Sequence, residues 1–181
     1  MTVFISGGAK NGKSSLAQEL AVKLAEGGHH YYLATMIPVD DEDRERIRRH
    51  VTDREGMGFE TIECPKNILS CLETGEKDGT YLLDSVTALL MNELFDPERD
   101  YALDPTAPER CREDLLRFVR SVANVVVVSD YIYSDAQHYD EITETYRRGL
   151  ADMDRSLAAV SDTVIEVSAG QVIVHKGVLP Q

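Results

Sequence analysis

The chain has few basic residues and no long apolar run. Lysine and arginine together number 19, against 32 aspartate and glutamate residues, so the formal net charge is −13 at pH 7. Proteins that bind nucleic acid usually present a basic face, and this balance argues against such a partner. No stretch approaches the length of a membrane span, and the first residues lack a leader pattern. We therefore expect a cytoplasmic protein without a membrane span.

Cysteines and linker sequences are also scarce. Cys64, Cys71 and Cys111 have neither the paired spacing of a metal site nor the even number of a disulfide framework. No Pro-, Gly- or Ser-rich linker divides the 181 residues, which are enough for one sizeable core. The sequence therefore predicts reduced thiols and a single domain over residues 1–181.

Residues 7–14 carry the most specific motif. They read Gly-Gly-Ala-Lys-Asn-Gly-Lys-Ser, after a β-branched and aromatic run at 3–5 and before helix-favouring sequence. The pattern is typical of a phosphate-binding P-loop, whose backbone N–H groups turn inward around the phosphates. A Gly-rich turn with a solvated lysine is the competing interpretation. The strand before the motif and the helix after it favour the P-loop, and with it a single P-loop nucleotide-binding domain over residues 1–181.

Each residue type in this loop suits a nucleoside triphosphate. Lys13 can bind the β- and γ-phosphates, Ser14 can bind Mg²⁺, and the following helix adds the positive end of its dipole. We therefore predict Mg²⁺ with GTP or ATP. The predicted nucleotide-binding residues of the loop are Gly7, Gly8, Ala9, Lys10, Asn11, Gly12, Lys13 and Ser14.

Strand and helix patterns alternate along the rest of the chain. Strands are predicted at 30–34, 59–63, 80–84, 124–129, 163–167 and 171–175. Helices are predicted from 14 to Gly27, from 40 to 50, and at 85–95, 109–122 and 142–160, with weaker helical character at 66–72. The β-branched run at 124–129 belongs in the centre of a sheet, and the last two strands form a hairpin. The fold class is α/β: a P-loop NTPase three-layer α/β/α domain with a mainly parallel sheet that closes with an antiparallel C-terminal hairpin.

Two further segments bear on the site. The apolar strand at 80–84 ends in Asp84, where a Walker B acid would reach Mg²⁺ beside Ser14, although a helix-capping aspartate would also fit. Pro97, Pro105 and Pro108 predict that residues 96–108 form an exposed loop, a candidate lid over the site.

Residues 40–50 begin with acids and end with bases, which is the charge order that a helix dipole favours. Asp40 can cap this helix. His50 and Arg54 lie one turn apart on it, with Arg48 and Arg49 beside the histidine. Taken alone, the pattern indicates a solvated, charged helix.

Together these motifs resemble the adenosylcobinamide kinase / adenosylcobinamide-phosphate guanylyltransferase family of late cobalamin biosynthesis. The matching elements cover nearly the whole chain and comprise the P-loop, residues 32–35, 46–50 with Arg54, 83–87 with Asn92, and the final helix and hairpin. The resemblance implies phosphorylation of the aminopropanol hydroxyl of adenosylcobinamide, then transfer of GMP from GTP onto that phosphate. It also implies that a histidine carries the GMP.

By this resemblance His50 is the nucleophile, and Lys13 is the second catalytic residue. A histidine that attacks an α-phosphate must be neutral, as an ordinary imidazole mostly is at pH 7. The resemblance further implies a corrinoid substrate, a homotrimer, and Ser14 and Asp84 as the metal-binding residues. The nucleotide contacts that it implies beyond the P-loop are Thr35, Val51, Thr52, Asp53, Arg54, Glu63 and Asp84.

The chain departs from the family pattern at three places. The family usually has Arg-Ser where this chain has Lys10-Asn11, at variable P-loop positions. Its Thr/Ser-Asn-Glu-Val-Gly-x-Gly stretch is replaced by Ser-Asp-Tyr-Ile-Tyr-Ser at 129–134, and in the final helix its Gly and Asn-Gln become Ala151 and Asp154-Arg155. We expect the loss of these glycines to affect corrinoid recognition more than nucleotide binding. Two alternatives therefore stay open: a P-loop kinase for another alcohol without guanylyl transfer, and a non-catalytic nucleotide-binding regulatory protein.

Overall fold

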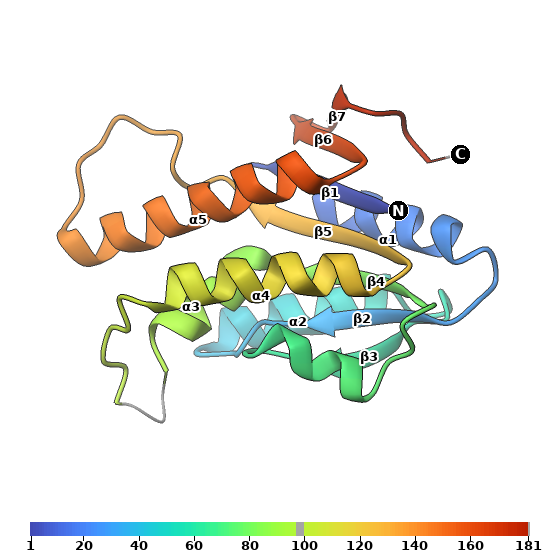
Figure 1. Ribbon diagram of the computed structural model, residues 1–181, viewed down its shortest axis with the longest axis horizontal. Helices are drawn as coiled ribbons and strands as arrows, with labels where there is room; N and C mark the ends of the chain where they lie inside the picture. The colour runs from blue at the N-terminus through green and yellow to red at the C-terminus, as the bar shows by residue number, and fades with distance from the viewer. Residues whose placement is uncertain (97–99, 181) are drawn as a thin grey trace.

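The computed structural model describes residues 1–96 and 100–180, and its strands form one seven-stranded sheet (Figure 1). The strands are β1 Thr2–Gly7, β2 His30–Ala34, β3 Glu60–Glu63, β4 Thr80–Asp84, β5 Asn124–Asp130, β6 Thr163–Ser168 and β7 Gln171–Lys176. Their order is β3-β2-β4-β5-β1-β6-β7, and every pair is parallel except β6 with β7. The predicted parallel sheet with an antiparallel C-terminal hairpin is confirmed, and β5 lies at its centre as predicted.

The helices also follow the sequence pattern. They are α1 Lys13–Ala25, α2 Asp41–Asp53, α3 Val86–Leu94, α4 Ala107–Ser121 and α5 Glu141–Val160, with a 3₁₀ helix, η1, at Ile68–Glu73. Asp40 caps α2 as expected, because its side chain accepts a hydrogen bond from the backbone N–H of Asp43 at 2.8 Å. Among the described helices, none is both long and apolar enough to cross a membrane.

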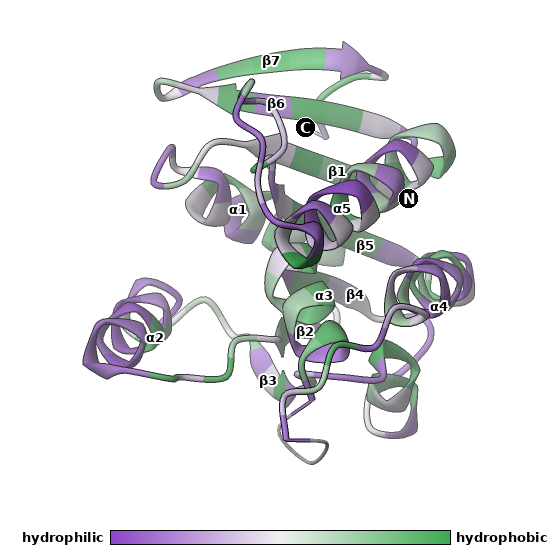
Figure 2. Cartoon of the chain, turned by 90° about the vertical axis from the view of Figure 1, so that its left-hand side faces the viewer, coloured by the Kyte–Doolittle hydropathy of each residue, from purple (hydrophilic) through white to green (hydrophobic). Residues whose placement is uncertain are grey.

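Alternate residues of the central strands pack into two separate hydrophobic cores, because successive side chains of a strand point to opposite faces of the sheet. Leu83 and Val127 belong to the core beneath α3, α4 and α5, whereas Leu82, Val126 and Val128 belong to the core beneath α1. Figure 2 shows α1 on one side of the sheet and α3, α4 and α5 on the other. The predicted three-layer α/β/α arrangement is confirmed.

The segment at 96–108 was predicted to be an exposed loop, and most of its described residues before α4 are exposed, but two positions differ. Asp104 and Ala107 are buried, and α4 begins at Ala107, two residues before the predicted start. Asp104 accepts hydrogen bonds from the backbone N–H and the hydroxyl of Thr106 and from Arg110. These bonds hold the pKa of the Asp104 carboxyl well below its usual range. Pro97, which the prediction placed in this loop, lies outside the described residues.

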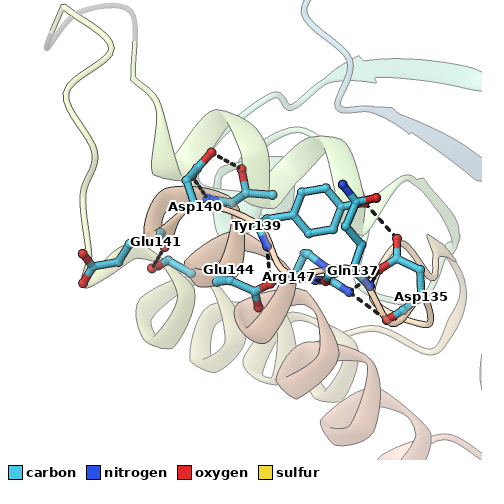
Figure 3. A network of polar contacts seen from close by, with 9 residues as sticks. Asp135, Gln137, Tyr139, Asp140, Glu141, Glu144 and Arg147 are labelled. Carbon is cyan, nitrogen blue, oxygen red and sulfur yellow. Dashed lines mark hydrogen bonds and ion pairs between the residues drawn. The ribbon is translucent and has the colours of Figure 1, made fainter.

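The connection between β5 and α5 is fixed to α5 by Arg147 (Figure 3). The Arg147 guanidinium donates to the carboxylates of Asp135 at 2.8 Å and Glu144 at 2.7 Å and to the backbone carbonyl of Gln137 at 3.1 Å. It also lies 4.7 Å from the ring centroid of Tyr139. Arg147 is buried, so its bonds join the connection to α5 in a part of the molecule sheltered from water.

Helix α5 also buries a carboxylate. Asp154 is only 4% exposed; its Oδ2 accepts a hydrogen bond from the Tyr133 hydroxyl at 2.7 Å, and its Oδ1 has no partner among the described residues. Burial raises the pKa of Asp154 to about 6, although the hydrogen bond from Tyr133 opposes this. An unfolded aspartate has a pKa of about 3.9, so the stabilisation from protonated Asp154 is complete below that pH and is lost as pH rises through the folded pKa.

We expect Asp154→Asn to raise the free energy of unfolding by about 1–3 kcal/mol at pH 7.5, because the neutral amide removes the cost of a buried charge. At pH 4.0 the gain should nearly vanish, since wild-type Asp154 is then protonated in the folded state. Urea unfolding at both pH values measures the difference. Asp152→Asn, at an exposed position of the same helix, is the control. A gain of equal size at both pH values would contradict the buried-charge explanation.

Candidate functional site

The P-loop connects β1 to α1 at the edge of the sheet where β2 and β5 also end, the edge that faces the viewer in Figure 2. Gly12 has φ 89°, a left-handed conformation that favours glycine. A Cβ on Gly7 would lie 2.4 Å from the carbonyl oxygen of Val167, so β1 needs glycine there to fit against β6. Helix α1 begins at Lys13, which directs the positive end of its dipole toward the loop. The predicted strand, loop and helix are all present.

Lys13 is held inside this loop by two contacts. Its side chain is 6% exposed, and Nζ donates to the carbonyl oxygen of Gly8 at 2.7 Å. Nζ also forms an ion pair with Oδ1 of Asp130 at 2.6 Å. The ammonium group is therefore already placed at the loop, with a carboxylate as its present counterion.

The P-loop opens on a cavity of about 440 Å³, which we call the P-loop cavity. Ser14 and Asp84 both line it, so the hydroxyl and the carboxylate predicted to bind Mg²⁺ share one space. Mg²⁺ is usually held by one or two carboxylates together with substrate phosphates, so this donor set fits the ion. The other residues of this cavity that matter below are Lys13, Arg46, Arg49, His50, Asp53 and Asp130.

A second cavity of about 330 Å³ shares Arg46, His50 and Asp84 with the first. We call it the second cavity. The Arg54 guanidinium lies 4.1 Å from the ring centroid of Tyr32, and its Nη2 donates to Thr61 at 3.2 Å. The cavity therefore combines a cation stacked on an aromatic ring with the carboxylate of Glu63.

Tyr32 joins this cavity to Asp84. Its hydroxyl donates to Oδ2 of Asp84 at 3.2 Å. Burial and the neighbouring Asp84 carboxylate raise the pKa of Tyr32 well above its usual range, so the phenol keeps its proton.

His50 lies between the two cavities and lines both. Its side chain is 24% exposed, and Nδ1 lies 3.8 Å from Oδ2 of Asp84, beyond hydrogen-bond distance. Nδ1 is buried and has no hydrogen-bond partner among the described residues. The structure thus brings His50, Asp84 and the P-loop, which are far apart in the sequence, to one place.

Helix α2, which carries His50, has no buried residue and stands apart from the sheet as a hydrophilic helix (Figure 2). The interpretation as a solvated, charged helix is therefore confirmed for most of its surface. One side nevertheless lines the cavities through Arg46 and His50, which are four residues apart and so share a face. Arg48 lines neither cavity and pairs with Glu45 at 2.6 Å.

Most of the predicted site residues line one of the two cavities. These are Ala9, Lys10, Asn11, Gly12, Lys13, Ser14, His50, Val51, Asp53, Arg54, Glu63 and Asp84. Gly7, Gly8, Thr35 and Thr52 line neither. Thr35 is fully buried, and its hydroxyl donates to the carbonyl oxygen of Ser85 at 3.0 Å and accepts from the Ser85 N–H at 2.8 Å. The binding roles of all these residues stay predictions.

The structure does not support two alternatives that the sequence left open. The N-cap of α3 is Ser85, whose hydroxyl accepts from the N–H of Ala88, so Asp84 does not cap that helix. Among the described residues between 100 and 108, none lines either cavity, so this part of the chain does not cover the site.

Sequence reasoning missed three residues at the site: Tyr32, Arg46 and Asp130. The spacing of four residues to His50 could have indicated Arg46. Asp130 was noted only as a departure from the family pattern, because the strand was predicted to end at 129. It is the last residue of β5, and the strand order that brings it beside the P-loop is not encoded in any local pattern.

Comparisons with known proteins agree with the fold. A solved ATPase domain has a similar fold, with a TM-score of 0.54 and 11% identity over 97% of this chain and 76% of that one. The RadB recombinase has a TM-score of 0.50 and 14% identity over 99% of this chain and 82% of that one. At such identities the likeness shows the fold alone, that of P-loop NTPases.

Comparison with curated proteins finds no match. The family model for cobinamide kinase / cobinamide phosphate guanyltransferase matches residues 3–174, which is nearly the whole chain. The chain therefore belongs to the cobinamide kinase / cobinamide phosphate guanyltransferase family.

Proposed function

We propose that this protein phosphorylates the aminopropanol hydroxyl of adenosylcobinamide and then transfers GMP from GTP onto that phosphate through a GMP carried by His50. Family membership supports cobinamide kinase and guanyltransferase activity. The observation that carries the proposal for this chain is the position of His50, between the P-loop cavity and the second cavity. We further propose that the chain acts in the cytoplasm as a single nucleotide-binding domain.

In this proposal the P-loop cavity holds the triphosphate. The backbone N–H groups of the loop and Lys13 bind the phosphates, while Ser14 and Asp84 hold Mg²⁺, which would neutralise phosphate charge. The nucleoside lies in the second cavity, where the guanidinium of Arg54 and the carboxylate of Glu63 are available to it. A carboxylate accepts hydrogen bonds from the N–H groups on one edge of guanine, which gives Glu63 a role in selecting GTP.

Guanylyl transfer begins with attack by the imidazole of His50. A proton on Nδ1, the nitrogen nearer Asp84, leaves the lone pair of Nε2 free for the α-phosphorus. A nitrogen–phosphorus bond forms, the bond from the α-phosphorus to the α–β bridging oxygen breaks, and diphosphate leaves with the electron pair. Arg46 and Arg49 line the same cavity and would stabilise the charge that develops on the phosphates.

The second half of the transfer releases the histidine. An oxygen of the acceptor phosphate attacks the α-phosphorus of the bound GMP, and the nitrogen–phosphorus bond breaks with its electron pair returning to His50. The imidazole is then free for another GTP.

A second candidate function is a P-loop kinase for a different alcohol, without guanylyl transfer. The observation that favours it is the connection between β5 and α5, where Arg147 binds Asp135 and Gln137 close to the place of the family's glycines. Tyr131 and Tyr133 in this connection present a different surface to an acceptor than a glycine-rich segment does.

We also propose a homotrimer. Strand β7 is the edge of the sheet, all six of its residues are exposed, and Val172, Ile173 and Val174 are among them. Apolar side chains on an exposed edge strand are commonly covered by another chain.

The His50→Ala variant tests the guanylyl transfer. After incubation with GTP and Mg²⁺, we expect wild-type protein to gain the mass of GMP on the peptide that contains His50. The variant should show no adduct, because the nucleophile is gone, while GTP affinity falls by no more than about threefold, since the P-loop is intact. Arg48→Ala is the control, because Arg48 lines neither cavity. An unchanged adduct in His50→Ala would sink the assignment.

The acceptor is tested by γ-phosphate transfer from labelled GTP or ATP to cobinamide and, in parallel, to small alcohols. Phosphorylated cobinamide is the expected product. Phosphorylation of another alcohol alone, in a preparation that forms no GMP adduct, would favour the second candidate function.

Light scattering coupled to size-exclusion chromatography tests the assembly. We expect the mass of three chains for the wild type and a smaller species for Val174→Lys, since a charge cannot be buried cheaply in an interface. The exposed substitution Glu19→Lys on α1 should leave the mass unchanged. A wild-type monomer would refute the trimer.

A further inference from the structure

Asp130 occupies a central position that the functions described so far do not use. It ends β5, which lies between β1 and β4, so it lies between the P-loop and the strand that ends in Asp84. Its backbone is fixed on both sides, because its N–H donates to the Thr87 hydroxyl at 2.9 Å and the next N–H, of Tyr131, donates to the carbonyl oxygen of Gly7 at 3.3 Å. The carboxylate is therefore held at one place by the sheet.

The carboxylate of Asp130 is directed to the P-loop. Oδ1 pairs with Lys13 Nζ at 2.6 Å, the side chain is 18% exposed, and the residue lines the P-loop cavity. Its other oxygen, Oδ2, has no hydrogen-bond partner among the described residues. One oxygen is thus engaged by the lysine, and the other remains able to accept a proton.

A bound triphosphate changes the surroundings of this carboxylate. The γ-phosphate competes for Lys13, the natural counterion of both groups, and places further negative charge beside Asp130. The negative charges of the γ-phosphate and of Asp130 repel each other, and transfer of a proton to Asp130 would remove one of them. An acceptor hydroxyl that attacks the γ-phosphorus must also lose its proton to a base.

We propose that Asp130 is the catalytic base of the phosphoryl-transfer step, an inference that rests on the proposed kinase activity. The acceptor oxygen forms a bond to the γ-phosphorus as the bond from that phosphorus to the β–γ bridging oxygen breaks. The nucleoside diphosphate leaves with the electron pair. The hydroxyl proton passes to Oδ2 of Asp130 and from there to solvent.

Asp130→Asn tests this role because it keeps the shape and removes the charge. GTP affinity, measured by titration calorimetry, should increase by about tenfold, since a negative charge beside the triphosphate is lost. Transfer of the γ-phosphate to cobinamide should fall by at least about 100-fold, the contribution of a general base. The GMP adduct on His50 should persist, because attack on the α-phosphorus needs no hydroxyl deprotonation.

The slow release of γ-phosphate to water is a readout that needs no acceptor. If the wild-type protein formed no GMP adduct and did not phosphorylate cobinamide, the proposed function would be refuted. A fall in phosphate release on Asp130→Asn would in that case still support Asp130 as the catalytic base. If Asp130→Asn bound GTP more tightly but transferred and released phosphate at the wild-type rate, the proposal that Asp130 is the catalytic base would be overturned. Asp130 would then be only a counterion of Lys13.

Two further variants complete the test. Asp130→Glu restores a carboxylate, so it should release phosphate faster than Asp130→Asn does. If Asp130→Glu released phosphate no faster than Asp130→Asn, that result would count against Asp130 as the catalytic base. Asp114→Asn, on α4, should match the wild type in every assay, because Asp114 lines neither cavity and pairs with Arg117 at 3.4 Å.

Discussion

The parallel pairing of β4, β5 and β1 determines where every group of the site can lie. Parallel strands bring their carboxyl ends to the same edge of the sheet, and this edge receives the P-loop, Asp84 and Asp130. Val125 to Val128 are buried on both faces of this sheet, with Val125 and Val127 in one core and Val126 and Val128 in the other. The positions of Lys13 and Asp130 relative to each other therefore depend on the packing of the whole sheet.

Helix α2 obeys a different constraint. It contributes no residue to either core and contacts the rest of the site through the walls of the two cavities. A helix with few buried contacts opens and shifts at low cost in free energy. The site thus joins a rigid part, the sheet edge with its P-loop, to a loosely packed part that carries His50, Arg46 and Arg49. This division into a rigid and a loosely packed part is compatible with the two proposed steps, phosphoryl transfer at the γ-phosphate and guanylyl transfer at the α-phosphate.

The local features of this site could be predicted from the sequence, and the features that depend on strand order could not. The P-loop, the strand ending in Asp84 and the capped helix that carries His50 each follow from neighbouring residues. Asp130 enters the site only because β5 lies between β1 and β4, which no local pattern specifies. The loop at 96–108 was predicted to be exposed from its prolines, yet Asp104 is buried because Thr106 and Arg110 satisfy its carboxylate.

Net charge is a poor guide to this site. The chain carries −13, which disfavours an extended polyanion, but the groups around the P-loop cavity are of both signs. Lys13, Arg46 and Arg49 attract phosphate, whereas Asp84 and Asp130 would repel it. In the proposed function a divalent cation faces Asp84 while the phosphates face the lysine and arginines, so a triphosphate that arrives with its cation meets less repulsion than a bare one. Asp130, which pairs with Lys13, then gains by accepting a proton.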